Sequence, residues 1–125
     1  MSYNQSLVKL KASATSPLKK VPVDTVVVEA TKPRTTAAYD QWINGLRDAT
    51  TRARIIVRVD RLCAGNAGDH RNLTDGVSEL KIDVGPGYRV YYTKKEVAII
   101  VLLAGGSKAT QAADIVQAIV LAKNL

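Results

Sequence analysis

Residues 79–92 hold two short segments of alternating apolar and polar residues around the turn-forming triplet Gly85–Gly87. In the first segment Leu80 and Ile82 alternate with polar neighbours, which is the period of a β-strand with one buried face. So short a turn leaves no room for a crossover connection, and the two strands must therefore run antiparallel. The sequence predicts a β-hairpin with Lys81 on its polar face.

The residues after this hairpin extend the sheet by a further strand. Alternation continues through residues 88–92, so that Arg89 and Tyr91 are predicted to share one face. A second turn at residues 94–96 leads into the unbroken apolar run of residues 97–103. Such a run is typical of a strand covered on both faces.

Two helices are predicted before these strands. The first follows a capping Thr35 or Thr36 and has four apolar residues at helical spacing, namely Tyr39, Trp42, Ile43 and Leu46. The second is predicted from about residue 50 to residue 64, with one apolar face formed by Ile55, Val59 and Leu62. Residues 66–76 are rich in turn formers and are expected to form an exposed loop.

A C-terminal helix is predicted to follow a hinge at Gly105 and Gly106, capped by Ser107 or Thr110. Its apolar side consists of Ile115, Ala118, Ile119 and Ala122. A short β-branched strand is predicted at residues 24–29. The expected fold is α+β: a short N-terminal strand, two helices, an antiparallel sheet of three to four strands and a C-terminal helix.

A chain of 125 residues is long enough for one core without covalent crosslinks. We expect a flexible tail at residues 1–22, for which a short hairpin or partner-binding arm is the alternative, and a single domain at residues 23–125. No apolar run approaches the roughly 20 residues that cross a bilayer, and residues 1–22 lack a signal-peptide core. The lone Cys63 cannot form an internal disulfide and is expected to be a core residue, so a cytoplasmic location is favoured.

The chain is basic, with 18 Lys and Arg against 11 Asp and Glu and a formal charge of +7. This excess favours an anionic partner such as nucleic acid or an acidic protein. Part of it falls on the second predicted helix, where Arg54, Arg58 and Arg61 share a face, and part on the turn that contains Lys94 and Lys95. We predict RNA contacts for both groups; a solvated helix surface is the alternative for the arginines.

Several kinds of chemistry find no support in the residues. One histidine and one cysteine do not make a metal centre or a nucleophilic triad, and His70 is interpreted as a surface residue of the exposed loop. Neither a Walker A loop nor a dinucleotide fingerprint is present. Cationic catalysis on a phosphodiester remains, because Lys81, Arg89 and Lys108 are predicted near the sheet edges, where they can stabilise phosphate charge. No metal or cofactor is expected.

Six segments together resemble the RelE/ParE superfamily of bacterial toxins, most closely the HigB-like addiction module killer proteins. They are residues 42–47, 52–55, 65–69, 76–80, 85–92 and 102–111. The resemblance covers residues 39–121, and the fold it implies agrees with the elements predicted from periodicity.

The resemblance implies a ribosome-dependent mRNA endoribonuclease that is neutralised by a cognate antitoxin of helix-turn-helix type, with which it would form a hetero-oligomer. It implies that Lys81, Arg89 and Lys108 act on the mRNA, and Tyr91 is our hypothesis for the proton acceptor. The chain departs from the usual HigB-like residues, arginine and aspartate, at Lys81 and Ser107. Alternatives are a ParE-like toxin that binds gyrase and a noncatalytic module that binds only its antitoxin.

Overall fold

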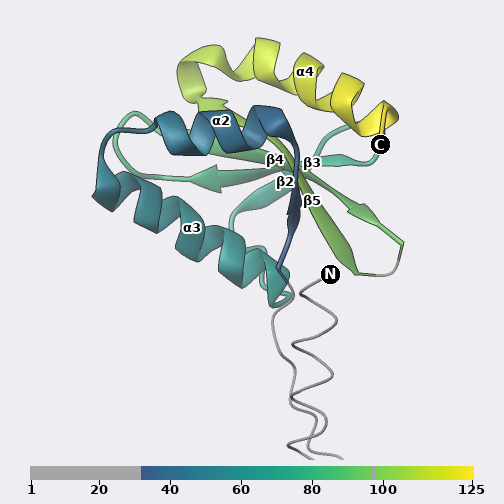
Figure 1. Cartoon of the computed structure of the whole chain (residues 1–125), viewed down its shortest axis with the longest axis horizontal. Helices are drawn as coiled ribbons and strands as arrows, with labels where there is room; N and C mark the ends of the chain where they lie inside the picture. The colour runs from purple at the N-terminus through teal and green to yellow at the C-terminus, as the bar shows by residue number, and fades with distance from the viewer. Residues whose placement is uncertain (1–31, 97) are drawn as a thin grey trace, which may run out of the picture.

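The computed structural model describes residues 32–96 and 98–125. The predicted tail at residues 1–22 and the predicted strand at residues 24–29 lie outside the described residues. The elements, shown in Figure 1, are β1 (Arg34–Thr35), α2 (Ala37–Gly45), α3 (Ala49–Cys63), β2 (His70–Asn72), β3 (Val77–Ile82), β4 (Tyr88–Lys95), β5 (Ile99–Ser107), the 3-10 turn η2 (Lys108–Thr110) and α4 (Gln111–Lys123).

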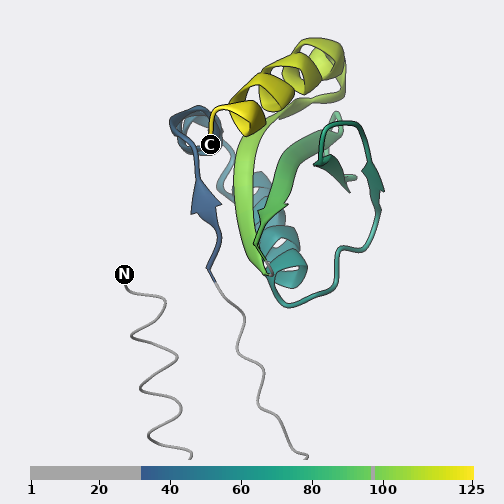
Figure 2. The same ribbon diagram turned by 90° about the vertical axis from the view of Figure 1, so that its right-hand side faces the viewer.

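The strands form one five-stranded sheet in the order β1-β5-β4-β3-β2. Figure 2 shows this order from β1 (blue) at one edge to β2 and β3 (teal) at the other. The predicted antiparallel pairing of β3, β4 and β5 is confirmed, while β1 pairs with β5 in parallel. The α+β fold class is likewise confirmed, but the sheet is mixed and has five strands where three to four antiparallel strands were predicted, because β1 and β2 add to its two edges.

The loop predicted at residues 66–76 is wrong at its centre, because residues 70–72 form strand β2 antiparallel to β3. Side chains reinforce this pairing. Arg71 Nε donates to Glu79 Oε1 at 2.7 Å, and Ser78 Oγ donates to Asn72 Oδ1 at 2.9 Å. These cross-strand contacts stabilise an edge strand whose own sequence lacks the usual apolar alternation.

Helices cover both faces of the sheet, so two cores form. On one face Tyr39 and Ile43 of α2, together with the apolar side of α3, contact Leu80, Val90 and other sheet residues. On the opposite face Ala118 of α4 contacts a second group that includes Tyr91. Both faces of β4 are therefore buried, and polar residues on the α4 face need partners inside the protein.

The predicted N-cap positions are confirmed at Thr36 for α2 and at Thr110 for α4, but only Thr36 makes a capping hydrogen bond with its side chain. Thr36 is the N-cap of α2, and its Oγ1 accepts from Tyr39 N at 3.1 Å. The side chains of Ser107 and Thr110 make no capping hydrogen bond at η2 or α4. Thr110 Oγ1 instead donates to Asp114 Oδ2 at 2.5 Å.

The predicted hinge at Gly105 and Gly106 is wrong, because β5 runs through both glycines to Ser107. A Cβ on Gly105 would lie 2.1 Å from Cε3 of Trp42, and one on Gly106 would lie 1.8 Å from Oδ2 of Asp114. The glycines are thus required by close packing of α2 and α4 on the strand, and not by a bend.

Within the described residues no helix is long and apolar enough to cross a membrane.

Candidate functional site

A cavity of about 270 Å³ lies at the end of the sheet where β3 turns into β4 and β5 leads into η2. It is lined by Asp69, Lys81, Ile82, Asp83, Gly85, Pro86, Gly87, Arg89 and Lys108. All three cations that the sequence singled out for phosphate chemistry therefore line one cavity. The cations come from three different segments of the chain.

Strand register explains how the three cations meet. Lys81 of β3 is directly opposite Arg89 of β4, and Arg89 is opposite Gly106 of β5. Opposed residues place their side chains on the same face, so Lys81 and Arg89 are neighbours. Lys108 follows two residues after Gly106, and its backbone N donates to Gly87 O at 3.0 Å, which fixes it beside the β3–β4 turn.

Arg89 is the most enclosed of the three cations, with 8% of its surface exposed. Its Nη1 donates to the Tyr88 carbonyl at 3.3 Å, while its Nε lies 3.8 Å from Glu79 Oε1 and has no hydrogen-bond partner. Nη2 makes no hydrogen bond to any described residue. This part of the guanidinium is free to donate to a ligand oxygen in the cavity.

Glu79 beneath Arg89 is a buried carboxylate, 1% exposed, that the alternation pattern had placed on a polar face. Its Oε1 accepts from Arg71, and its Oε2 accepts from Gln111 Nε2 of α4 at 2.7 Å. Burial alone would raise the pKa of Glu79, but the hydrogen bonds from Arg71 and Gln111 and the charges of Arg71 and Arg89 bring it below its ordinary value. Glu79 therefore stays ionised and holds Arg89 electrostatically.

The lowered pKa of Glu79 predicts acid sensitivity. Because the unfolded state binds this proton more readily, the stabilisation by Glu79 is complete above its ordinary pKa of 4.5 and is lost as pH falls through the lower folded value. Glu79→Gln should lower the free energy of unfolding by about 1–2 kcal/mol at pH 7, and the stability of this variant should depend less on pH below pH 5. Urea unfolding of wild type and Glu79→Gln between pH 7 and pH 3 measures the free energy of unfolding of each protein. An equal loss of stability with falling pH in the two proteins would contradict this assignment.

The proposed proton acceptor Tyr91 is not in the cavity. Its side chain is fully buried under α4, and its hydroxyl has no hydrogen-bond partner. Burial, followed by the charges of Glu79 and Asp114, raises the pKa of Tyr91 well above its ordinary value. A group that neither reaches the cavity nor readily loses its proton is unsuited to act as a base, so the structure argues against this role.

Two carboxylates, Asp69 and Asp83, line the cavity beside the cations. Both side chains are exposed. Sequence reasoning did not single them out as site residues, although Asp83 stands two residues after Lys81 on the same strand pattern and could have been found from that spacing. They supply proton acceptors at the place where Tyr91 does not.

The three α3 arginines predicted to contact RNA do not form one free face. The guanidinium of Arg58 donates to three backbone carbonyls, those of Lys81 at 2.6 Å, Ala67 at 3.0 Å and Asp69 at 3.3 Å. Arg58 therefore ties α3 to the rim of the cavity and is not available for a second partner in this conformation. Arg54 and Arg61 are exposed and border a shallow apolar groove that includes Val57.

The remaining sequence candidates lie elsewhere. Lys94 and Lys95 are exposed at the end of β4, away from the β3–β4 turn. Cys63 packs against the core on the α3 face, and burial, followed by the Asp60 carboxylate, raises its pKa to about 11. Among residues 32–96 and 98–125, no group of three or more His, Cys, Asp and Glu side chains could hold a metal ion.

The chain is similar to a curated protein of Haemophilus influenzae that is described as an uncharacterized protein. The two are 44% identical over 92 residues, which cover 74% of this chain and 93% of the relative. No protein-family model matches the chain, and no solved structure matches it significantly.

Proposed function

We propose that this chain, which belongs to the same family as the uncharacterized Haemophilus influenzae protein, is the toxin of a type II toxin–antitoxin system. In this proposal it is a HigB-like member of the RelE/ParE superfamily that cleaves ribosome-bound mRNA in the cytoplasm without a metal ion. The observation that carries the proposal is the cavity that Lys81, Arg89 and Lys108 line together.

The cavity residues suit cleavage by the RNA's own 2′-OH. Attack of the 2′-oxygen on the adjacent phosphorus breaks the P–O5′ bond and leaves a 2′,3′-cyclic phosphate and a 5′-OH. Asp69 or Asp83 would accept the 2′-OH proton, and Lys108 would donate one to the leaving 5′-oxygen. Arg89 Nη2 and Lys81 would stabilise the extra negative charge on the phosphorane oxygens.

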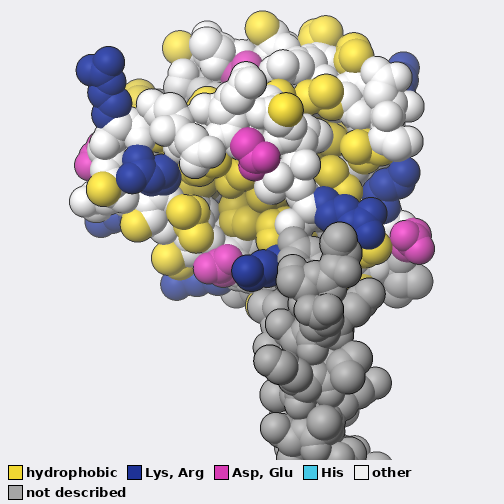
Figure 3. Space-filling model, viewed as in Figure 1, with side chains coloured by type: hydrophobic (Ala, Val, Ile, Leu, Met, Phe, Trp, Pro, Cys, Tyr) yellow, Lys and Arg dark blue, Asp and Glu magenta, His cyan; other side chains and the backbone are white. Residues whose placement is uncertain are grey.

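The antitoxin in this proposal covers the outer surface of α3. A groove there is lined by Thr50, Ala53, Arg54, Val57 and Arg61, and the neighbouring Ile56 and Val57 are 45% and 46% exposed. Figure 3 shows apolar side chains (yellow) beside Lys and Arg side chains (blue) over this helix. An acidic amphipathic helix would match both properties.

The same α3 groove also favours the second candidate function, in which the domain acts only by binding a protein, as a ParE-like toxin or an antitoxin-binding module. Brief induction in a bacterial host followed by mapping of mRNA 5′ ends separates the candidates. New cuts in translated mRNAs are expected from the proposal. Arrest without cuts would favour a ParE-like target, and no arrest would favour the binding-only module.

RNA binding through the cavity should depend steeply on salt. Neutralising about three phosphates of single-stranded RNA predicts that log K falls with log salt with a slope of about −2, because bound counterions are released. Fluorescence anisotropy with a labelled single-stranded RNA between 50 and 300 mM KCl measures this slope. An affinity that does not change with salt would contradict phosphate recognition.

A further inference from the structure

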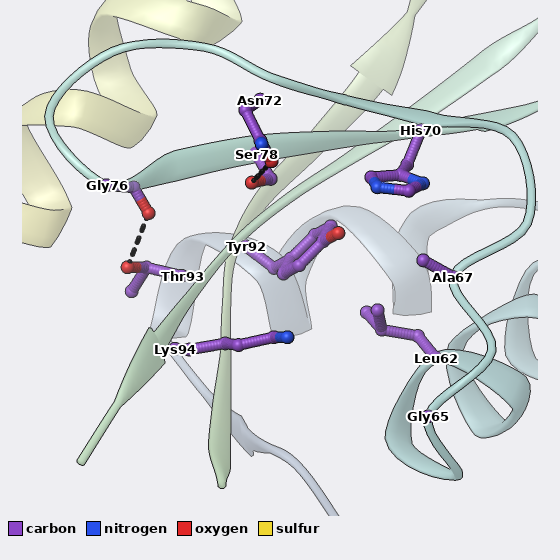
Figure 4. Close-up of a pocket in the computed structure, with 10 residues that line it drawn as sticks. All are labelled: Leu62, Gly65, Ala67, His70, Asn72, Gly76, Ser78, Tyr92, Thr93 and Lys94. Carbon is purple, nitrogen blue, oxygen red and sulfur yellow. Dashed lines mark hydrogen bonds between the residues drawn. The ribbon is translucent and has the colours of Figure 1, made fainter. Parts of the chain in front are cut away.

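A second, larger cavity of about 380 Å³ lies on the other face of the sheet. It opens between β2, β3, β4 and the C-terminal end of α3, and Figure 4 shows its lining residues. The polar ones are His70, Asn72, Ser78, Tyr92, Thr93 and Lys94. Asn72, Ser78 and Tyr92 are opposed across three strands, so their side chains lie in one row on this face.

The hydrogen bonds of His70 leave an acceptor available to a ligand. His70 Nδ1 lies 2.8 Å from the Gly68 carbonyl, and a carbonyl only accepts, so Nδ1 carries the proton. In the neutral ring Nε2 then has a lone pair, and it makes no hydrogen bond to any described residue. The fixed contact with Gly68 also holds the ring in one orientation over the cavity.

Asn72 leaves a donor available beside that acceptor. In this structure its Oδ1 accepts from Ser78 Oγ at 2.9 Å, and Nδ2 has no partner among the described residues. Tyr92 lines the cavity and is only 3% exposed because it packs into the core of this face, so its ring is held as a wall of the cavity. An aromatic wall with a donor and an acceptor suits a flat heterocycle with both on its edge.

The charge of the cavity favours an anionic group on the same ligand. Among the described residues that line the cavity, Lys94 is the one charged side chain and none is a carboxylate, and the exposed Lys95 follows it. Lys94 makes no ion pair within the described part of the chain, and Figure 4 shows its amine below the Tyr92 ring, directed toward Leu62. A phosphate attached to the heterocycle would neutralise it.

We propose that this cavity binds a single nucleotide, with the base against Tyr92, its edge at His70 and Asn72, and its phosphate at Lys94. The cavity volume of about 380 Å³ suits one nucleotide and is too small for a folded segment of RNA or protein. The ligand can be a free mononucleotide or one unpaired residue of an RNA chain, which share this chemistry. The site is on the face opposite Arg89, so its occupancy does not depend on the cleavage chemistry proposed above.

The chain contains one histidine, so the imidazole C–H signals in an NMR spectrum report on this cavity without assignment ambiguity. Titration of the whole chain with AMP should shift these signals saturably, while ribose 5-phosphate, which lacks the base, should bind at least about tenfold more weakly. Lys94→Ala should raise the Kd for AMP about tenfold, the loss of one charge-assisted hydrogen bond. Lys123→Ala, at the end of α4, is the matched control and should leave the Kd unchanged.

A pentaribonucleotide distinguishes the two sources of the nucleotide. Displacement of AMP by the RNA would identify an RNA residue as the occupant, and AMP binding without competition would identify a free nucleotide; both outcomes support the site. Absence of a saturable His70 shift with either ligand would overturn it, as would an AMP affinity equal in wild type and Lys94→Ala. Because no cleavage is measured, failure here and failure of the endoribonuclease assay are separate results.

Discussion

In the proposed endoribonuclease, Arg89→Ala is expected to lower mRNA cleavage about 100- to 1,000-fold while the domain remains folded. Arg89 is the cavity cation whose position is most restricted, since Glu79 lies 3.8 Å from its Nε and the Tyr88 carbonyl accepts from its Nη1. A hydrogen-bond donor that is held in place before the reaction stabilises the developing phosphorane charge more than a mobile donor does. Removal of one such donor typically lowers the rate about 100- to 1,000-fold. Cleavage is measured by 5′-end mapping after brief induction.

Two variants control this experiment. Arg89→Lys keeps the charge but loses the planar fork, so it should recover only part of the activity. Lys123→Ala removes an exposed lysine at the end of α4 and should cleave like wild type. Wild-type cleavage by a folded Arg89→Ala protein would remove Arg89 from the mechanism, and loss of the folded circular dichroism spectrum would shift the test to the exposed Lys108→Ala.

The sequence predicted the α+β class and the approximate bounds of three helices, because apolar periodicity is a local signal. It also placed Lys81 and Arg89 correctly on strands, and cross-strand register then brings their side chains together. The alternation of apolar and polar residues along a strand does not show which polar positions are exposed to solvent. Glu79 sits at a polar position of β3, yet α4 covers that face and Gln111 donates to its carboxylate.

Two further differences arise from tertiary contacts that have no local sequence signal. Arg58 lies on the basic face of α3 as predicted. The segments that contain Ala67, Asp69 and Lys81 pack beside α3, and their backbone carbonyls accept hydrogen bonds from the Arg58 guanidinium. Tyr91 shares a face with Arg89 as predicted, but α4 packs over it and excludes solvent. A role for either residue could be judged only after the neighbouring segments were placed.

Gly106→Ala is expected to destabilise the domain by about 2–3 kcal/mol, within the usual range for overpacking a filled site. Its Cβ would lie 1.8 Å from Asp114 Oδ2 and 2.8 Å from Thr110 Oγ1, so these two side chains, which are hydrogen-bonded to each other at the start of α4, must shift. Gly106 is opposite Arg89, and that movement would also disturb the wall of the cation cavity. Urea unfolding at pH 7 measures the change.

A double-mutant cycle tests the cause of that loss. Asp114→Ala removes the nearest clashing atom, so Gly106→Ala should cost at least about 1 kcal/mol less in the Asp114→Ala background than in wild type. Gly45→Ala is the matched control, because a Cβ there meets nothing within 4 Å, and it should be neutral or stabilising at the end of α2. Equal costs of Gly106→Ala in the two backgrounds would show that the loss arises in the strand itself, and the close approach of α4 would then not explain why glycine stands at this position.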